Sequence, residues 1–214
     1  MRIPNHIALI PDGNRRWAQN SGMNKHEGYD HGLIPGVACL KAVQGYGVKE
    51  LTYYGFTTDN CKRPSIEVEA FKNACIKAIE LIQGEDAALL VVGNTDSAMF
   101  PKALLPFTEQ RVIFGKGTTK VNFLVNYGWE WDLSCMHTIS SNRNTIMQNL
   151  RSREISRIDL VVRWGGRYRL SGLLPVQTVY ADIYSINEMW PEYEDTHILQ
   201  ALKWYDGQDI TLGG

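Results

Sequence analysis

One short stretch of the chain places a carboxylate, two guanidinium groups and turn residues directly after an apolar run. The run, residues 7–10, has the length of a buried strand, and Pro11 ends it because its ring fixes φ and removes a backbone donor. After it come Asp12, the turn-forming Gly13 and Asn14, and then Arg15, Arg16 and Trp17 at the start of a predicted helix. A carboxylate at the end of a strand can hold Mg²⁺, and helix-start amides and arginines can hold phosphate. The stretch suits a magnesium diphosphate; the alternative is a solvent-exposed turn in which Asp12 caps the helix.

Two further polar segments, residues 57–63 and 163–171, also follow predicted strands directly. With the first stretch they supply five arginines: Arg15, Arg16, Arg63, Arg163 and Arg169. Half-buried arginines need anionic partners, and the nearby acids, Asp12, Asp59 and Asp182, are too few to pair with all of them. A phosphate-rich ligand would complete the set, because guanidinium groups bind phosphate oxygens in a bidentate fork. The alternative is that each arginine lies in solvent.

The elements that must position these residues alternate between strands and helices. Strands are predicted over residues 7–10, 51–56, 88–92, 121–125, 158–162 and 183–186. Helices are predicted over 15–19, 29–46, 65–83 with Ser65 as N-cap, 131–150, 174–180 and 195–205, and residues 96–116 are expected to be partly helical. This alternation predicts the α/β class: a single domain over residues 1–214 whose mainly parallel sheet is flanked by helices.

Composition excludes several other classes of protein. The 214 residues carry a formal net charge of −1. The chain therefore lacks the overall positive charge that is typical of a nucleic-acid-binding protein. The four cysteines are scattered without a Cys-x-x-Cys pair, which predicts free thiols in a reducing cytoplasm. No apolar run approaches the roughly 18 residues that span a bilayer, so at most a peripheral membrane contact is expected. The chain also lacks a P-loop, a G-x-G-x-x-G fingerprint and a cluster of histidines.

In these segments the chain resembles the cis-prenyltransferases, the family of undecaprenyl diphosphate synthase. The resemblance rests on residues 6–18, 51–68, 93–94, 126–128 and 159–193, which occur in the family's order. It implies an elongated apolar tunnel between the sheet and its helices, and a homodimer. It also implies an enzyme that uses Mg²⁺ to join an allylic prenyl diphosphate to isopentenyl diphosphate.

The resemblance assigns roles residue by residue. Asp12 matches the essential magnesium-associated aspartate, and Asp182 replaces a glutamate that contributes to magnesium binding. Asn60 and Tyr29 are the further catalytic candidates, Tyr29 because it takes the place of the family's histidine. The expected substrate-binding residues are Gly13, Asn14, Arg15, Arg16, Trp17, Lys25, Thr57, Thr58, Asp59, Arg63, Arg163, Arg169, Leu170 and Ser171.

Several positions depart from the family pattern. Arg15 replaces a glycine, Cys61 replaces a tryptophan and Trp164 replaces a threonine. The usual C-terminal Arg-x-Gly element is not recognisable in residues 203–214. The segment 64–93 is about four residues short, which predicts a short product of roughly C10 to C25, since each helical turn adds about 5.4 Å. Head-to-tail condensation is expected, with the head-to-middle reaction of lavandulyl-type members as the alternative. A non-catalytic partner subunit of another cis-prenyltransferase is the competing function.

Overall fold

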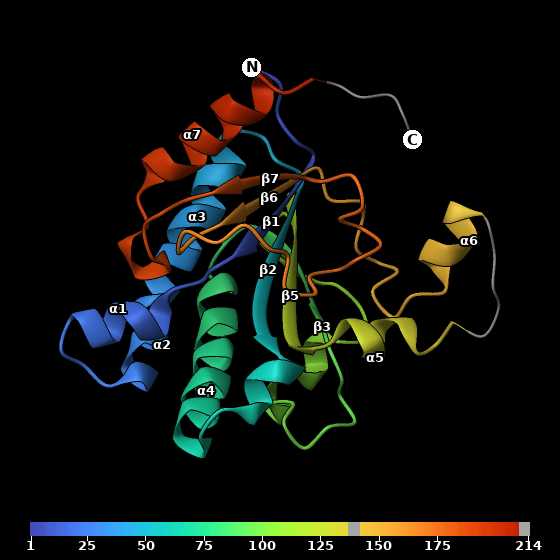
Figure 1. The fold of residues 1–214 in the computed structure, drawn as a ribbon. Coiled ribbons are helices and arrows are strands. Elements are labelled where there is room, and N and C mark those ends of the chain that lie inside the picture. Colours follow the sequence, from blue (N-terminus) through green and yellow to red (C-terminus); the bar gives the residue numbers. More distant parts are fainter. Residues whose placement is uncertain (137–141, 210–214) are drawn as a thin grey trace.

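The computed structural model describes residues 1–136 and 142–209, and every strand in them belongs to one seven-stranded sheet. The strand order is β4-β3-β5-β2-β1-β6-β7, and only β4 runs antiparallel to its neighbour. The strands are β1 His6–Ile10, β2 Glu50–Thr57, β3 Ala87–Val92, β4 Val112–Phe114, β5 Thr119–Tyr127, β6 Leu160–Arg163 and β7 Asp182–Ser185. Helices cover both faces, with α1 to α4 and α7 on one side and α5 and α6 on the other (Figure 1). The expected single α/β domain with a mainly parallel sheet is confirmed.

The helices match the prediction in number more closely than in length. They are α1 Asn14–Asn20, α2 Gly28–His31, α3 Leu33–Gly45, α4 Ser65–Ile82, α5 Trp129–Leu133, α6 Arg143–Gln148 and α7 Asp195–Asp206. Short 3₁₀ turns are η1 Lys25–Glu27, η2 Thr58–Lys62, η3 Lys102–Phe107 and η4 Trp190–Glu192. The predicted N-cap Ser65 is wrong by one residue: Pro64 holds that position without a side-chain bond.

Three predicted helices need correction. The 29–46 helix breaks at Gly32 into α2 and α3. A Cβ at Gly32 would lie 2.7 Å from the Asn14 side-chain oxygen and the Trp190 ring, so this close approach requires glycine. Residues 131–150 hold the end of α5 and the whole of α6, with 137–141 outside the described residues. Residues 174–180 form turns, since Leu174 has a φ of 37° and Pro175 follows it. Within 96–116, η3 accounts for the helical part, and the strand β4 was not expected.

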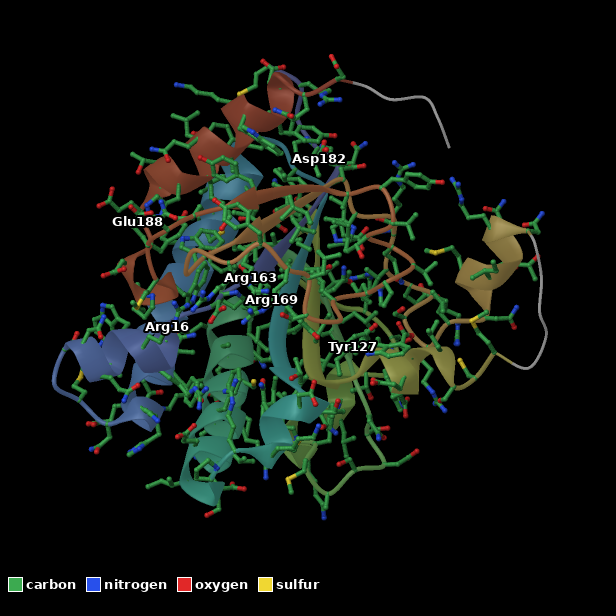
Figure 2. All side chains as sticks on the ribbon, in the orientation of Figure 1. Arg16, Tyr127, Arg163, Arg169, Asp182 and Glu188 are labelled. Carbon is green, nitrogen blue, oxygen red and sulfur yellow. The ribbon has the colours of Figure 1, made fainter. Side chains whose placement is uncertain are left out.

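Strand register brings distant segments to one edge of the sheet. Ile10 at the end of β1 pairs with Arg163 at the end of β6, and Leu9 pairs with Tyr53 of β2. The chain segments that leave β1, β2 and β6 therefore emerge together. Asp182 begins β7, whereas Arg163 ends the neighbouring parallel strand β6. The two residues therefore lie at opposite ends of the strands, as Figure 2 shows.

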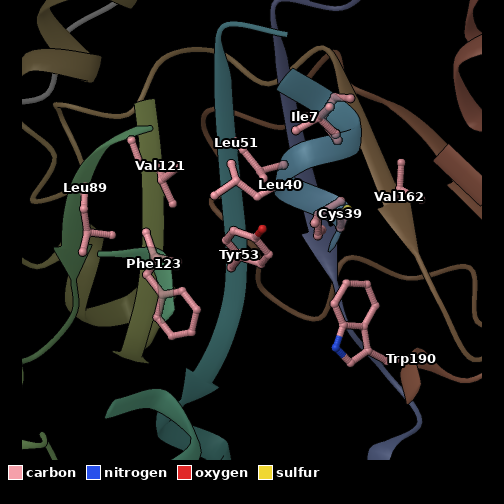
Figure 3. Close-up of a cluster of buried hydrophobic side chains, with 14 of the residues drawn as sticks. Ile7, Cys39, Leu40, Leu51, Tyr53, Leu89, Val121, Phe123, Val162 and Trp190 are labelled. Atoms are coloured by element: carbon pink, nitrogen blue, oxygen red, sulfur yellow. The ribbon is translucent and has the colours of Figure 1, made fainter. Parts of the chain in front are cut away.

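Two apolar layers hold the sheet between its helices. The larger layer packs Leu40 and Cys39 of α3 against Ile7 and Leu51 of the strands, and it extends across the sheet to Phe123 (Figure 3). The second layer lies on the other face and includes Ala8, Ile10, Tyr54, Leu124 and Tyr127. All four cysteines are free thiols, as expected, and Cys39 and Cys75 are buried.

A buried histidine, His6, begins β1 and so lies at the opposite end of the strands from Ile10 and Arg163. His6 Nε2 is 2.8 Å from Thr52 Oγ1, and His6 Nδ1 is 4.0 Å from a Glu50 carboxylate oxygen. Burial lowers the pKa of His6 below 6.5, and attraction from Glu50 opposes this shift without reversing it.

This arrangement predicts a pH dependence of stability. The unfolded chain takes up a proton at His6 at a higher pH than the folded chain, so this stability is fully present above pH 6.5. It is lost as pH falls through the folded pKa. The melting temperature should therefore fall from about pH 7 to about pH 5, and less steeply in His6→Gln. Half-buried His26→Gln is the control that keeps the wild-type slope; equal slopes in all three proteins would refute the role of His6.

Candidate active site

One buried guanidinium organises the carboxyl edge of the sheet. Arg163 is 3 % exposed, and its Nη2 donates to Asp12 Oδ2 at 2.7 Å. Its Nη1 donates to Ser171 Oγ at 3.0 Å and to the carbonyl oxygen of Arg169. Arg16 approaches Asp12 Oδ1 to 3.5 Å from the other side and donates to the Gly165 carbonyl at 3.0 Å. Figure 2 shows Arg16, Arg163 and Arg169 gathered in this region.

The helix-cap alternative for Asp12 is wrong. Gly13, with a φ of 109°, is the N-cap of α1, and no side-chain cap bond is made there. The peptide around Asp12 is instead held from η4, where the Trp190 N–H donates to the Asp12 carbonyl at 3.0 Å. Trp190 Nε1 donates to the Gly32 carbonyl at 2.8 Å, so the same residue also ties the start of α3 to the site. The Asp12 carboxylate is thus left facing the two arginines.

A cavity of about 570 Å³ opens beside this carboxylate. Seven cationic side chains line it, namely Arg15, Arg16, Lys25, Arg63, Arg163, Arg167 and Arg169, together with the carboxylates of Asp12 and Asp59. Its remaining wall is largely apolar and includes Leu33 and Val37 of α3, Cys75, Ala78 and Ile82 of α4, and Phe123 of β5. The cavity therefore joins a strongly cationic region to an apolar one, which suits a ligand with an anionic head and a hydrocarbon tail.

Helix α4 holds one side of the cationic region. Glu67 in its first turn is buried, and its carboxylate accepts from Arg15 Nη1 at 2.8 Å. Arg63 Nη1 donates to the Tyr29 hydroxyl oxygen at 2.9 Å, and the Tyr29 ring stacks on Phe71 with centroids 4.5 Å apart. Burial raises the pKa of Tyr29, so the phenol keeps its proton, which remains available for donation.

The loop after β2 closes on itself through a reciprocal cap. The Thr57 hydroxyl accepts from the Asn60 N–H at 3.3 Å, and the Asn60 side-chain oxygen accepts from the Thr57 N–H at 3.1 Å. This leaves the amide NH₂ of Asn60 as the group on that side chain that can donate to a ligand. Asp59 is exposed and pairs with Lys62 at 2.6 Å.

Four of the expected site residues lie outside the cavity wall. Trp17 packs on His31, Thr58 lies against Gly128, and Leu170 joins the second apolar layer. Asp182 pairs in register with Leu160 and so lies at the opposite edge from Asp12, because β7 runs parallel to β6. Within one copy of the chain, the two proposed metal ligands do not meet.

Other wall residues were not predicted as site residues. They include Gln19, Arg167, Trp190, Tyr53 and Tyr54, with Glu67 as the partner of Arg15. An acidic residue three positions after Pro64, on a helix with an apolar stripe, was a signal for Glu67. Trp190 and Tyr54 carry no such local signal, since their partners are remote in sequence.

The donor set around Asp12 fits Mg²⁺ when a diphosphate is also bound. In residues 1–136 and 142–209 no group of three His, Cys, Asp or Glu side chains could hold a metal ion. Mg²⁺ in enzymes commonly takes one or two carboxylates and completes its shell with substrate phosphates and waters. Asp12, 30 % exposed at its side chain, offers such a carboxylate.

The fold and this amphipathic, cation-lined cavity suit an α/β protein that binds a ligand with an anionic head and a hydrocarbon tail, and comparison with known proteins agrees. Residues 10–213 match the family model described as putative undecaprenyl diphosphate synthase, so the chain belongs to this family of cis-type prenyltransferases, which condense prenyl diphosphates. No helix in the described part of the chain is long and apolar enough to cross a membrane.

Individual relatives cover nearly the whole chain. A (2E,6E)-farnesyl-diphosphate-specific ditrans,polycis-undecaprenyl-diphosphate synthase of Vibrio parahaemolyticus is 26% identical over 229 residues, covering 99% of this chain and 91% of that one. An isoprenyl transferase of Thermotoga maritima is 29% identical over 233 residues, covering 100% and 98%. The structure of lavandulyl diphosphate synthase from Lavandula x intermedia with dimethylallyl diphosphate superposes with a TM-score of 0.84 at 21% identity, covering 99% and 98%. At that identity the structural match supports the fold.

Proposed function

We propose that this cavity joins an allylic prenyl diphosphate to isopentenyl diphosphate with the help of Mg²⁺ and releases a short cis-prenyl diphosphate. The observation that carries the proposal is the 2.7 Å contact between Asp12 and buried Arg163, both of which line a cavity that is cationic in one part and apolar in another. The same residues argue against a non-catalytic partner subunit, since a subunit without a reaction has no need of this charged constellation.

Two groups of cationic side chains and neutral hydrogen-bonding groups suit two diphosphates. Arg163, Arg169 and Ser171 form one group, which we assign to isopentenyl diphosphate. The amides of the α1 start, with Arg16, Lys25 and Arg63, form the second group for the allylic diphosphate.

The chain's own residues suit the electron flow of this reaction. The allylic C1–O bond breaks, its electron pair leaves with the diphosphate, and the double bond of isopentenyl diphosphate attacks C1 through C4. The proton then lost from C2 restores neutrality and leaves the new cis double bond. Mg²⁺, when bound at Asp12, supplies further positive charge to the departing diphosphate. Arginines fixed before the reaction stabilise that charge without reorganising, while Tyr29 and Asn60 donate hydrogen bonds.

The deciding experiment supplies purified protein and Mg²⁺ with labelled isopentenyl diphosphate and allylic primers from C5 to C20. Linear cis products identified by mass spectrometry support the proposal, and no product with any primer contradicts it. A parallel incubation contains dimethylallyl diphosphate alone. A branched C10 diphosphate there would establish head-to-middle condensation, the alternative to head-to-tail joining. Linear product that needs isopentenyl diphosphate would exclude it.

The apolar wall sets the expected product length. Along α4 it runs from Phe71 to Ile82, about three helical turns or on the order of 16 Å, comparable to three isoprene units. We therefore expect products of roughly C10 to C25. Ile82→Ala should lengthen the main product by about one isoprene unit, since it removes the last wall residue on α4. Exposed Ile66→Ala serves as the control, and C50 products from the wild-type chain would contradict the expectation.

An unpaired sheet edge favours a homodimer. β7 is the last strand of the sheet, and the neighbouring apolar side chains Tyr168, Val179, Tyr180 and Ile183 are exposed. Two β7 edges related by a two-fold axis would run antiparallel. Asp182 of a second copy would then lie toward the carboxyl edge that holds Asp12, where it can serve the metal that it does not reach within its own chain.

Subunit complementation tests this arrangement. Asp12→Ala and Asp182→Ala chains are each expected to be nearly inactive. If Asp182 serves the partner's site, refolding an equal mixture should restore about a quarter of the wild-type activity, because half the dimers are mixed and each holds one intact site. Activity that stays at the level of the separate variants would contradict a shared site. Sedimentation at several concentrations measures the dimer itself.

A further inference from the structure

The Arg169–Ser171 segment has a strained backbone conformation that buried neighbouring groups must stabilise. Ser171 has a φ of 52°, and Gly172 follows with a φ of 81°. A non-glycine residue in this left-handed region is disfavoured unless its surroundings fix it. Both Arg169 and Ser171 are exposed, so solvent contact alone would let the segment relax.

Arg163 holds the segment from one direction. It donates to the Ser171 hydroxyl and to the Arg169 carbonyl, but it leaves the Ser171 carbonyl free. The Ser171 carbonyl accepts instead from the hydroxyl of Tyr54 at 2.8 Å, across 117 positions of sequence. Tyr54 is 7 % exposed on β2 and also lines the cavity. Burial raises the pKa of its phenol, so the group stays a donor.

A bulge in β2 positions the Tyr54 hydroxyl. The pairing of β2 with β5 shifts register between Tyr54 and Phe56, which marks a bulge at Gly55. A Cβ on Gly55 would lie 2.8 Å from the Leu124 carbonyl, so the close approach of the two strands requires glycine. The Tyr54 ring is held edge-on against Tyr127, with centroids 6.2 Å apart.

We propose that Tyr54 is a positioning residue that holds Ser171 in its left-handed conformation and thereby shapes the diphosphate-binding loop. The inference rests on the proposed function in that the anion it concerns is the diphosphate of isopentenyl diphosphate. Tyr54 acts through the Ser171 backbone, so it governs affinity for this substrate and leaves the bond-forming step unchanged.

The test compares Tyr54→Phe with Tyr127→Phe, each of which keeps its ring and loses one buried hydroxyl. Tyr127 donates to Asp132 at 2.7 Å, and its hydroxyl also meets the backbone of Leu174, beyond the Arg169–Ser171 segment. Calorimetric titration with isopentenyl diphosphate needs no turnover, so it judges this inference even if condensation fails. Tyr54→Phe should weaken binding about fivefold to tenfold, the effect of one lost hydrogen bond, and Tyr127→Phe less than twofold. In steady-state assays KM for isopentenyl diphosphate should rise by the same factor while kcat stays constant.

A second comparison tests the conformational reason. Ser171→Ala and Ser171→Gly both remove the hydroxyl, but only glycine adopts a positive φ without strain. In the wild-type background the two variants should bind alike, because Tyr54 holds the loop. In the Tyr54→Phe background the glycine variant should bind severalfold more tightly than the alanine variant. Equal binding there, or a loss in Tyr127→Phe that matches Tyr54→Phe, overturns the inference, and thermal melts verify that each variant folds.

Discussion

Replacement of Asp12 by asparagine is expected to lower turnover by a hundredfold or more while the chain stays folded. The carboxamide can still accept from Arg163 Nη2, so the local packing survives. The negative charge that would hold Mg²⁺ against the departing diphosphate is lost. Removal of one such stabilising group commonly costs about 3 kcal/mol in the transition state.

The measurement is turnover of labelled C5 substrates at saturating Mg²⁺, together with a thermal melt. Asp30→Asn is a matched control, because Asp30 is an exposed aspartate that pairs with Lys77 at 2.8 Å and does not line the cavity. It should keep wild-type turnover. Near-normal turnover in Asp12→Asn would remove the basis of the proposed metal site.

The second large effect is expected for Arg163→Lys. The guanidinium contacts Asp12, Ser171 and Arg169 at once, in directions that a single ammonium cannot match. Lysine keeps the charge but loses the bridge between the Asp12 carboxylate and the loop. We expect kcat/KM for isopentenyl diphosphate to fall about a hundredfold, equivalent to roughly 3 kcal/mol of lost interaction with the transition state.

Exposed Arg153→Lys provides the control for this change and should behave as wild type. Calorimetry with isopentenyl diphosphate separates lost binding from lost chemistry. A variant with unchanged kcat/KM would show that the bridge is structural only, and the assignment of this cation group to isopentenyl diphosphate would then fall.

Local patterns were sufficient for most of the fold. The apolar run 7–10 is β1, and the stripe after Pro64 is α4, because each pattern repeats with the period of its element. The turns at 174–180 and the break at Gly32 were missed. Leu174 adopts a positive φ that no residue pattern predicted, and the close approach of Asn14 and Trp190, which requires glycine at position 32, is set by the tertiary structure.

For the site, the sequence by itself determined which kinds of residue follow the strands: the carboxylate of Asp12 and the arginines that line the cavity. It could do so because strand ends that meet at one sheet edge are implied by an alternating α/β order. Only the tertiary structure decided which groups meet. It brought Arg163 into contact with Asp12 and Arg15 into contact with Glu67. It separated Asp182 from Asp12 and Arg163 by the length of a strand. Register and strand direction fix these distances, and neither is encoded in the spacing of residues along the chain.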